Sequence, residues 1–139
     1  INKNSNAFVK NQDEDDDSGH KRSFSSVLQY LEEVEKDRGF RADNMMDQIE
    51  EICVKTVLAV QPALAHAYRS CQPDDLENSM CFQILGMDII IDHKLKPWLL
   101  EVNHLSSFGT DSPIDKRIKF DLIWDTFTLL NLSIKRKKK

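Results

Sequence analysis

The sequence predicts an α+β fold in which an antiparallel hairpin is accompanied by helices. Two largely apolar runs, residues 84–91 and 96–102, are separated by a short connection that begins with polar residues. This arrangement is typical of two β-strands joined by a tight turn. Apolar side chains recur at helical spacing before and after the two runs. With 139 residues, of which 40% are apolar, the chain suffices for one domain with a core.

Two helices are expected before the hairpin. Ser23 is a suitable N-cap for the first helix and Asp43 for the second. Pro62 should end or kink the second helix near Val60, because proline has no N–H for the helical hydrogen bonds, and residues 63–68 should continue as a last helical segment. The apolar stripes expected to face the core are Phe24, Val27, Leu28, Leu31 and Val34 in the first helix, and Met45, Ile49, Ile52, Cys53, Thr56, Val57 and Val60 in the second.

A third helix is expected after the hairpin. Ser112 should be its N-cap, with Pro113 at the first helical position and Asp115 at the spacing of a capping box. Its apolar side chains are expected to bury the helix against the sheet. These side chains are Ile114, Ile118, Leu122, Ile123, Phe127 and Leu130.

The predicted hairpin brings two carboxylates together. We expect its turn to be centred between Lys94 and Leu95. This register places Asp88 directly opposite Glu101, with Asn103 two residues further along the same face. Opposed like charges destabilise a sheet, and a bound cation removes that cost. Carboxylate and carboxamide oxygens suit Mg²⁺, although the pattern also permits a carboxylate that points to solvent or a register shifted by one residue.

The hairpin sequence resembles the C-terminal motif of the tubulin tyrosine ligase-like family, which are ATP-dependent amino-acid ligases of the ATP-grasp type. Residues 86–88 resemble the family's Gly-Phe-Asp, with Met87 in place of Phe. Residues 96–103 match its Lys-Pro-Trp-Leu-Leu-Glu-Val-Asn without a break. The following loop departs from the family, because Leu105 and Ser106 stand where it usually has Ser-Pro. The shape of this loop is therefore left open.

The resemblance implies that residues 1–134 are the C-terminal part of an ATP-grasp-like ligase domain. Residues 1–9 are expected to continue a strand, residues 10–22 to form an acidic flexible loop, and residues 135–139 to start a basic tail. The parts that bind adenine and the lysines that hold the ATP phosphates are expected elsewhere. We therefore expect this chain alone to lack ligase activity, because the reaction needs both parts in one geometry.

The chemistry that the resemblance implies is ligation through an acyl phosphate. ATP phosphorylates a carboxylate, and an amine then attacks the activated carbonyl, so anionic groups must be brought together by cations. Asp88 and Glu101 are the implied Mg²⁺ ligands, and Glu101 is implied to bridge two ions. Asn103 is implied to complete the coordination of the second ion and to contact the nucleotide. Lys119, and more weakly Lys3, are implied to hold the carboxylates of the amino-acid substrate. A solvated surface role is the alternative for either lysine.

His104 follows the motif directly and bears on which amino acid is added. In the family this position varies with activity, and histidine there resembles the polyglutamylases that extend glutamate chains. The resemblance implies that His104 contacts the acceptor carboxylate or helps to orient the attacking amine. The alternative is an ordinary loop residue at a variable position.

Charge is unevenly distributed along the chain. The formal net charge is −4, and residues 1–134 alone carry −9, because five cations stand at the C-terminus: Lys135, Arg136, Lys137, Lys138 and Lys139. A basic segment on an acidic body indicates a solvated tail or an arm for a polyanion, such as nucleic acid, an anionic membrane or the acidic tails of tubulin. The resemblance favours microtubules through these tubulin C-terminal tails, with free glutamate as the second substrate and neither nucleic acid nor membrane as partner.

The sequence predicts neither a signal peptide nor a membrane span. Three cysteines without metal-binding or paired spacing indicate a reducing compartment. The resemblance implies a cytoplasmic, cytoskeletal location, with the cilium or basal body as a further one. The expected function is tubulin polyglutamylation. A catalytically silent microtubule-binding module, and a ligase of the same family that adds glycine or tyrosine, are the alternatives.

Overall fold

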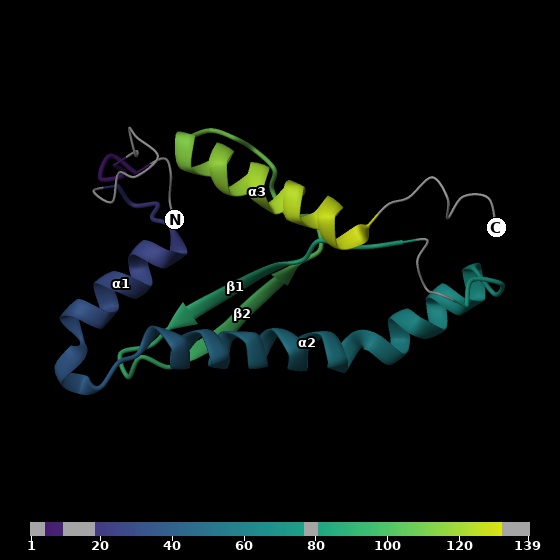
Figure 1. The fold of residues 1–139 in the computed structure, drawn as a ribbon, viewed down its shortest axis with the longest axis horizontal. Helices are drawn as coiled ribbons and strands as arrows, with labels where there is room; N and C mark the ends of the chain where they lie inside the picture. Colours follow the sequence, from purple (N-terminus) through teal and green to yellow (C-terminus); the bar gives the residue numbers. More distant parts are fainter. Residues whose placement is uncertain (1–4, 10–18, 77–80, 132–139) are drawn as a thin grey trace. The chain divides into compact units, whose positions relative to one another are not determined.

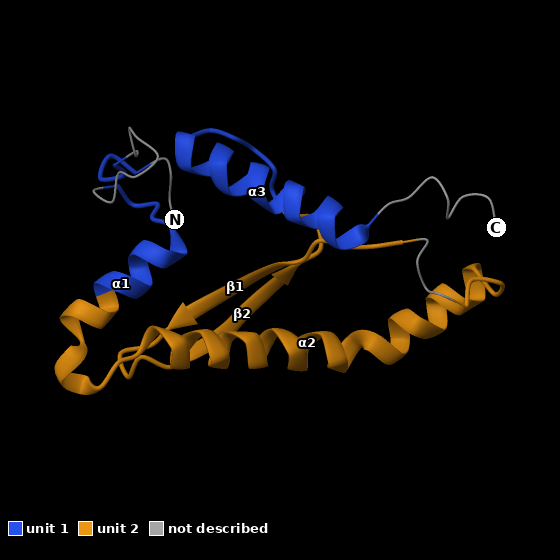
Figure 2. Ribbon diagram, viewed as in Figure 1, with its two compact units in different colours: residues 1–30, 107–139 blue, residues 31–106 orange. Residues whose placement is uncertain are grey.

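The structure, a computed structural model, describes residues 5–9, 19–76 and 81–131. Its elements, in order, are α1 (Phe24–Val34), the 3-10 helix η1 (Lys36–Arg38), α2 (Ala42–Cys71), β1 (Gly86–Ile91), β2 (Pro97–Asn103) and α3 (Pro113–Leu130) (Figure 1). Helices together with an antiparallel two-stranded sheet confirm the α+β class. The chain divides into two compact units, residues 1–30 with 107–139 and residues 31–106 (Figure 2).

The sheet in unit 2 contains a β-bulge. Gly86 to Asp88 pair with Asn103 to Glu101, whereas Ile89 to Ile91 pair with Leu99 to Pro97. Leu100 is therefore the additional residue on β2. The predicted pairing of Asp88 with Glu101 is confirmed, and both strands begin or end within two residues of the predicted bounds.

The predicted centre of the turn is wrong by half a residue. The N–H of Asp92 donates to the carbonyl of Lys96 over 2.9 Å, which centres the turn on Lys94. An unbroken ladder from this turn would have moved every later pair by one position. The bulge compensates for this shift, so the expected partners meet at the far end of the hairpin.

The Asp92 carboxylate organises the turn. Its Oδ1 accepts the N–H groups of Lys94 and Lys96 at 2.8 and 3.0 Å, and its Oδ2 accepts the indole N–H of Trp98 at 2.9 Å. The bond from the Lys96 backbone, followed by that from Trp98, lowers the pKa of Asp92 to about 2. Leu95 takes a left-handed conformation with φ 63°, which is uncommon for a residue other than glycine.

Helix α2 differs from its predicted form at its start, whereas residues 63–68 continue as helix beyond Pro62 as predicted. Arg41 is the N-cap, so the prediction of Asp43 as the cap is wrong, and Asp43 lies in the first turn instead. A carboxylate there still favours the positive end of the helix. The helix passes through Pro62 without ending, and it bends in its second half (Figure 1). Met45, which is 1% exposed, is its buried anchor, and α2 packs against β2.

In unit 1, both predicted helix caps are confirmed. The hydroxyl of Ser23 accepts the N–H of Ser26 at 3.1 Å, and that of Ser112 accepts the N–H of Asp115 at 3.3 Å. Pro113 occupies the first position of α3, where its missing N–H costs nothing.

The predicted apolar stripes are much less buried than expected. Among the described residues, the buried hydrophobic side chains are Leu28, Met45 and Ile114. The prediction that α3 buries its whole stripe is wrong, because most of that stripe is exposed: Ile118, Leu122, Ile123 and Phe127. Residues 5–9 form a turn and coil rather than the predicted strand. No helix in the described part of the chain is both long and apolar enough to span a membrane.

We predict that Asp92→Ala loosens the hairpin, because three hydrogen bonds lose their common acceptor. Amide hydrogen exchange in β1 should accelerate in the variant. His93→Ala is the matched control, since it changes a neighbouring exposed side chain without removing these bonds. Equal protection in both variants would contradict this role of Asp92.

The same carboxylate predicts a pH dependence. Because the folded-state pKa of Asp92 lies below the ordinary value of 3.8, the ionised form stabilises the hairpin above that pH. This contribution should be lost as the pH falls from 3.8 towards about 2. Amide hydrogen exchange in β1, measured across this pH range, should accelerate in the unmodified protein as the pH falls. The Asp92→Ala variant should show no such change.

Candidate metal and substrate site

Three polar side chains gather at the end of the hairpin away from its turn. Asn103 Nδ2 donates to Glu101 Oε1 over 3.0 Å and lies 3.4 Å from Asp88 Oδ2. Both carboxylates are exposed and Asn103 is half-buried. The structure thus brings together the three residues that the sequence predicted as neighbours on one face.

The bulge determines which residue faces Asp88. If the register set by the turn continued unbroken, Asp88 would lie opposite Leu100, and Glu101 would lie opposite Met87. The extra residue shifts Glu101 onto Asp88 and leaves Leu100 63% exposed. Bulges commonly redirect a side chain at a functional site, and here two carboxylates become direct neighbours.

Gly86 provides the space beside this cluster. It pairs with Asn103, and a Cβ atom added to it would lie 3.2 Å from Ser106 Oγ and 3.4 Å from Asn103 Cβ. Ser106 Oγ is itself buried and has no hydrogen-bond partner among the described residues. The glycine therefore lets the loop after β2 fold back against the strand, with one hydroxyl left unsatisfied.

The donor set fits a hard divalent cation. Two opposed carboxylates offer four oxygen atoms, and the Asn103 carboxamide can rotate from presenting its N–H to presenting its oxygen. In the described part of the chain, no three His, Cys, Asp or Glu residues gather. The site is therefore not a closed protein cage. Mg²⁺ commonly binds to one or two carboxylates and takes its other ligands from water and phosphates.

His104 is exposed and follows Asn103 at the end of β2. Its carbonyl accepts the side-chain N–H of Gln83 over 2.6 Å. Gln83 therefore holds the backbone on which His104 is displayed. The sequence analysis missed Gln83, since one amide side chain before a strand carries no pattern that assigns it a partner 21 residues away.

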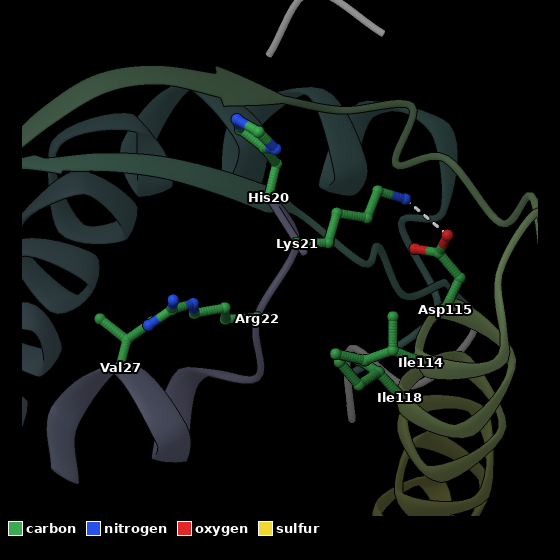
Figure 3. Close-up of a pocket in the computed structure, with 7 residues that line it drawn as sticks. All are labelled: His20, Lys21, Arg22, Val27, Ile114, Asp115 and Ile118. Atoms are coloured by element: carbon green, nitrogen blue, oxygen red, sulfur yellow. Dashed lines mark hydrogen bonds and ion pairs between the residues drawn. The ribbon is translucent and has the colours of Figure 1, made fainter. Parts of the chain in front are cut away.

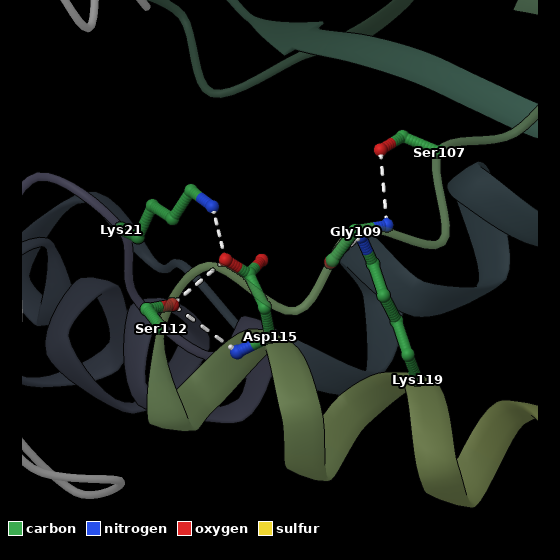
Figure 4. A network of polar contacts seen from close by, with 6 residues as sticks. All are labelled: Lys21, Ser107, Gly109, Ser112, Asp115 and Lys119. Atoms are coloured by element: carbon green, nitrogen blue, oxygen red, sulfur yellow. Dashed lines mark hydrogen bonds and ion pairs between the residues drawn. The ribbon is translucent and has the colours of Figure 1, made fainter.

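Lys119 belongs to unit 1 and is engaged within it. Its Nζ donates to the carbonyl of Gly109 over 2.7 Å (Figure 4). The N–H of Gly109 in turn donates to the hydroxyl of Ser107 over 3.4 Å. The lysine thus braces the loop that leads into α3. Its predicted role with the substrate stays a prediction. Lys3, residues 10–18 of the acidic loop and the tail residues Lys135, Arg136, Lys137, Lys138 and Lys139 lie outside the described residues.

A second polar cluster in unit 1 joins residues far apart in the sequence. Lys21 Nζ lies 2.5 Å from Asp115 Oδ2, which also accepts the Ser112 hydroxyl at 2.7 Å (Figure 4). Burial raises the pKa of Asp115, but Lys21 and Ser112 together lower it further, so it lies below its usual value. No sequence pattern linked these residues, because 94 positions separate lysine from aspartate.

This ion pair lines a pocket of about 370 Å³ in unit 1 (Figure 3). Ile114 and Ile118 form an apolar side of the pocket, and Lys21 and Arg22 bring positive charge to it. The charge of Lys21 is already neutralised by Asp115. The pocket is therefore a weaker candidate for an anion than its lysine and arginine suggest.

Comparison with known proteins identifies the class. A sequence model of the Tubulin-tyrosine ligase family matches residues 1–139, so the chain belongs to this family. It is 49% identical over 138 residues to a "Probable beta-tubulin polyglutamylase" of Tetrahymena thermophila, covering 99% of the chain and 11% of that protein. It is 45% identical over 139 residues to "Tubulin polyglutamylase TTLL6" of Homo sapiens, covering 100% of the chain and 15% of that protein.

A mouse protein, "Tubulin polyglutamylase TTLL13", is 43% identical over 141 residues, which cover 100% of the chain and 16% of that relative. The chain thus corresponds to a small share of each relative. The family resemblance noted in the hairpin motif is confirmed over the whole chain.

We predict that Ser106→Ala stabilises the protein by roughly 1 kcal/mol, because it removes a buried hydroxyl that has no partner. Gly86→Ala should instead destabilise by roughly 1–3 kcal/mol, because its methyl group meets Ser106 and Asn103. The double variant should recover part of this loss. Chemical denaturation measures all three, and strictly additive effects would contradict the proposed steric conflict.

Proposed function

We propose that the complete protein carrying this chain is a tubulin polyglutamylase, which ligates glutamate to glutamate residues or chains on tubulin tails at the expense of ATP. The observation that carries the proposal is the Asp88–Glu101–Asn103 cluster within a chain whose relatives bear polyglutamylase names. Because a silent binding module has no need for opposed carboxylates, we favour an enzyme. The relatives' names favour glutamate over glycine or tyrosine.

In this proposal residues 1–134 are the C-terminal portion of an ATP-grasp catalytic domain, with the acidic loop at 10–22 and the basic tail from 135. The hairpin carries the metal-binding end of that domain. Phosphate-holding and adenine-binding groups come from other parts of the protein. The support is the family match together with the chain's small share of its relatives.

Asp88, Glu101 and Asn103 would hold Mg²⁺, which supplies positive charge for the ATP phosphates and the developing acyl phosphate. The two carboxylates would provide the ligand charge, and the Asn103 carboxamide would provide an oxygen for the metal and a contact with the nucleotide. The bulge fixes the opposition of the carboxylates before substrate arrives. The protein thereby avoids much of the cost of arranging its ligands during the reaction.

His104 is proposed to contact the acceptor carboxylate or to orient the attacking amine, because it is exposed immediately after Asn103. Lys119, and more weakly Lys3, are proposed to hold the carboxylates of free glutamate. For Lys119 this requires exchange of its bond with the Gly109 carbonyl for one with the substrate. Such exchange is favoured chemically, because an ammonium group binds a carboxylate more strongly than it binds a neutral carbonyl.

The proposed partners are microtubules, recognised through the acidic C-terminal tails of tubulin, rather than nucleic acid or membrane. Lys135, Arg136, Lys137, Lys138 and Lys139 would attract these tails. The proposed location is the cytoplasmic cytoskeleton, including the cilium or basal body, since that is where microtubules occur.

The amino-acid specificity is tested with the complete protein, microtubules, ATP and radiolabelled amino acids. Glutamate should be incorporated, whereas glycine and tyrosine should not. Incorporation of one of those instead would replace the proposed reaction by another ligation. Absence of any incorporation, with microtubule binding retained, would favour the silent module.

Glu101→Gln in the complete protein should reduce turnover by at least about a hundredfold, because a metal ligand loses its charge. Its stability without metal should stay level or rise, since the repulsion with Asp88 is relieved. Glutamate incorporation and thermal unfolding measure the two effects. Glu50→Gln, an exposed change on α2 with the same loss of charge, is the matched control.

Full activity of Glu101→Gln would remove Glu101 from the metal site. Unfolding of that variant in the absence of metal would mean that the carboxylate is structural. Either result would refute the proposed cross-strand site, whereas the Glu50→Gln control should match the unmodified protein in both measurements.

Replacing residues 135–139 by five glutamines should weaken microtubule binding and flatten its dependence on salt, because charge attraction is screened over about 8 Å at physiological ionic strength. Turnover of a short soluble glutamate peptide should change little, since the tail acts on encounter rather than on chemistry. Co-sedimentation over a series of ionic strengths measures the binding. An unchanged series would assign docking to another surface.

A further inference from the structure

A pocket of about 170 Å³ lies in unit 2 at the opposite end of the hairpin from Asp88 and Glu101. Residues of η1, the first turns of α2 and the hairpin turn line it. Three cations and two amides lie on its walls, and no Asp or Glu does. The lining residues that carry the argument are Arg38, Arg41, Lys94, Asn44, Gln48 and Met45.

The backbone around this pocket is held by specific contacts. Arg38 Nη2 donates to the carbonyl of His93 over 2.7 Å, which ties the hairpin turn to η1. Arg38 Nη1 also pairs with Glu35 Oε2 at 2.9 Å. Gly39, with φ 73°, allows the sharp turn between η1 and α2. The walls are therefore preorganised, and Arg38 is largely neutralised by its own partners.

Within the described residues, the other two positive charges on the wall, those of Lys94 and Arg41, are at most weakly paired. Among the residues that the structure describes, Lys94 forms no ion pair. Arg41 Nη2 lies 3.7 Å from Asp43 Oδ2, but the two side chains are 69% and 87% exposed, so this contact is weak. Arg41 is also the N-cap of α2 and supplies no side-chain acceptor to its first turn, where the N–H of Ala42 donates to Glu32 Oε1 over 2.8 Å. An anion in the pocket would therefore gain from the charges of Lys94 and Arg41.

The size of the pocket restricts the ligand to one small anionic group. Its volume of about 170 Å³ lies well below the roughly 300–1,000 Å³ of sites that enclose a whole small molecule. A planar guanidinium and an ammonium suit a carboxylate attached to a longer chain. We infer that this pocket binds a glutamate side-chain carboxylate of an acidic acceptor peptide. This inference rests on the proposed function.

The position of the pocket predicts a length requirement. Lys94 and Asp88 are six positions apart, so at roughly 3.3 Å per residue their Cα atoms are at most about 20 Å apart. An extended acceptor of about six residues is therefore long enough to occupy both the pocket and the carboxylate end. The pocket would act as a second binding site, away from the carboxylate end of the hairpin, that favours long acidic tails over short ones.

The test uses the complete protein and fluorescent glutamate-rich peptides of about four and about twelve residues, which fall on either side of this length. The variant is Arg41→Gln with Lys94→Gln. Fluorescence anisotropy at fixed ionic strength should report at least about fivefold weaker binding of the long peptide, with binding of the short peptide unchanged. Lys55→Gln with Lys116→Gln, which removes the same charge from exposed positions elsewhere, should resemble the unmodified protein.

Equal weakening in both double variants would overturn the inference, because it would reduce the effect to overall charge. So would equal weakening for both peptide lengths. A loss confined to a phosphoserine peptide of equal length and charge, with the glutamate peptide unaffected, would also overturn it.

The proposed reaction is assayed separately by glutamate incorporation in the same preparations. If the unmodified protein transfers no glutamate while long-peptide binding still depends on Arg41 and Lys94, the proposed function fails and the carboxylate pocket stands. If transfer proceeds and the pocket variant binds the long peptide normally, the pocket fails and the proposed function stands.

Discussion

The opposition of Asp88 and Glu101 across a two-stranded sheet is the constraint on which the candidate site depends. Such a pair costs stability unless a positive group lies between the carboxylates. In the structure the carboxamide N–H of Asn103 takes that position, bonded to Glu101 and within 3.4 Å of Asp88. A cation would satisfy the same oxygens with full charge. Under the proposed function, these oxygens would hold a metal ion, and the opposition of the two carboxylates would serve binding rather than the stability of the sheet.

Several local features serve to maintain this opposition. The Asp92 carboxylate fixes the turn, the bulge at Leu100 corrects the register, and Gly86 leaves space for Asn103 and the following loop. Each is a small local feature, but loss of the turn contacts or of the bulge would move Glu101 away from Asp88. A one-residue slip in a strand reverses the face of every side chain beyond it. The geometry of the site is therefore governed by residues other than the two carboxylates themselves.

The hairpin also connects two different electrostatic environments. One end concentrates carboxylate oxygens, and the other end, with the start of α2, presents Arg41 and Lys94. In the two proposals, an acidic peptide would bind at the cationic end, whereas a metal ion with its phosphates would bind at the acidic end. A rigid pair of strands sets the distance between them, so the two preferences can act on one extended substrate without competing.

The sequence by itself determined the α+β class, the two strands, the caps at Ser23 and Ser112, the meeting of Asp88 with Glu101, and the family. These follow from local chemistry: alternation and apolar runs predict strands, and hydroxyl groups before helices predict caps. The tertiary structure decided the turn centre and the bulge. The shifted turn and the extra residue Leu100 change the strand register in opposite directions, so their effects cancel at Asp88 and leave no trace in the residue pattern. It also decided burial, since periodicity identifies the apolar face of α3 but not what covers it. Long-range partners such as Lys21 with Asp115, and the cationic pocket beside Lys94, depend on how the chain folds back on itself, which no local pattern encodes.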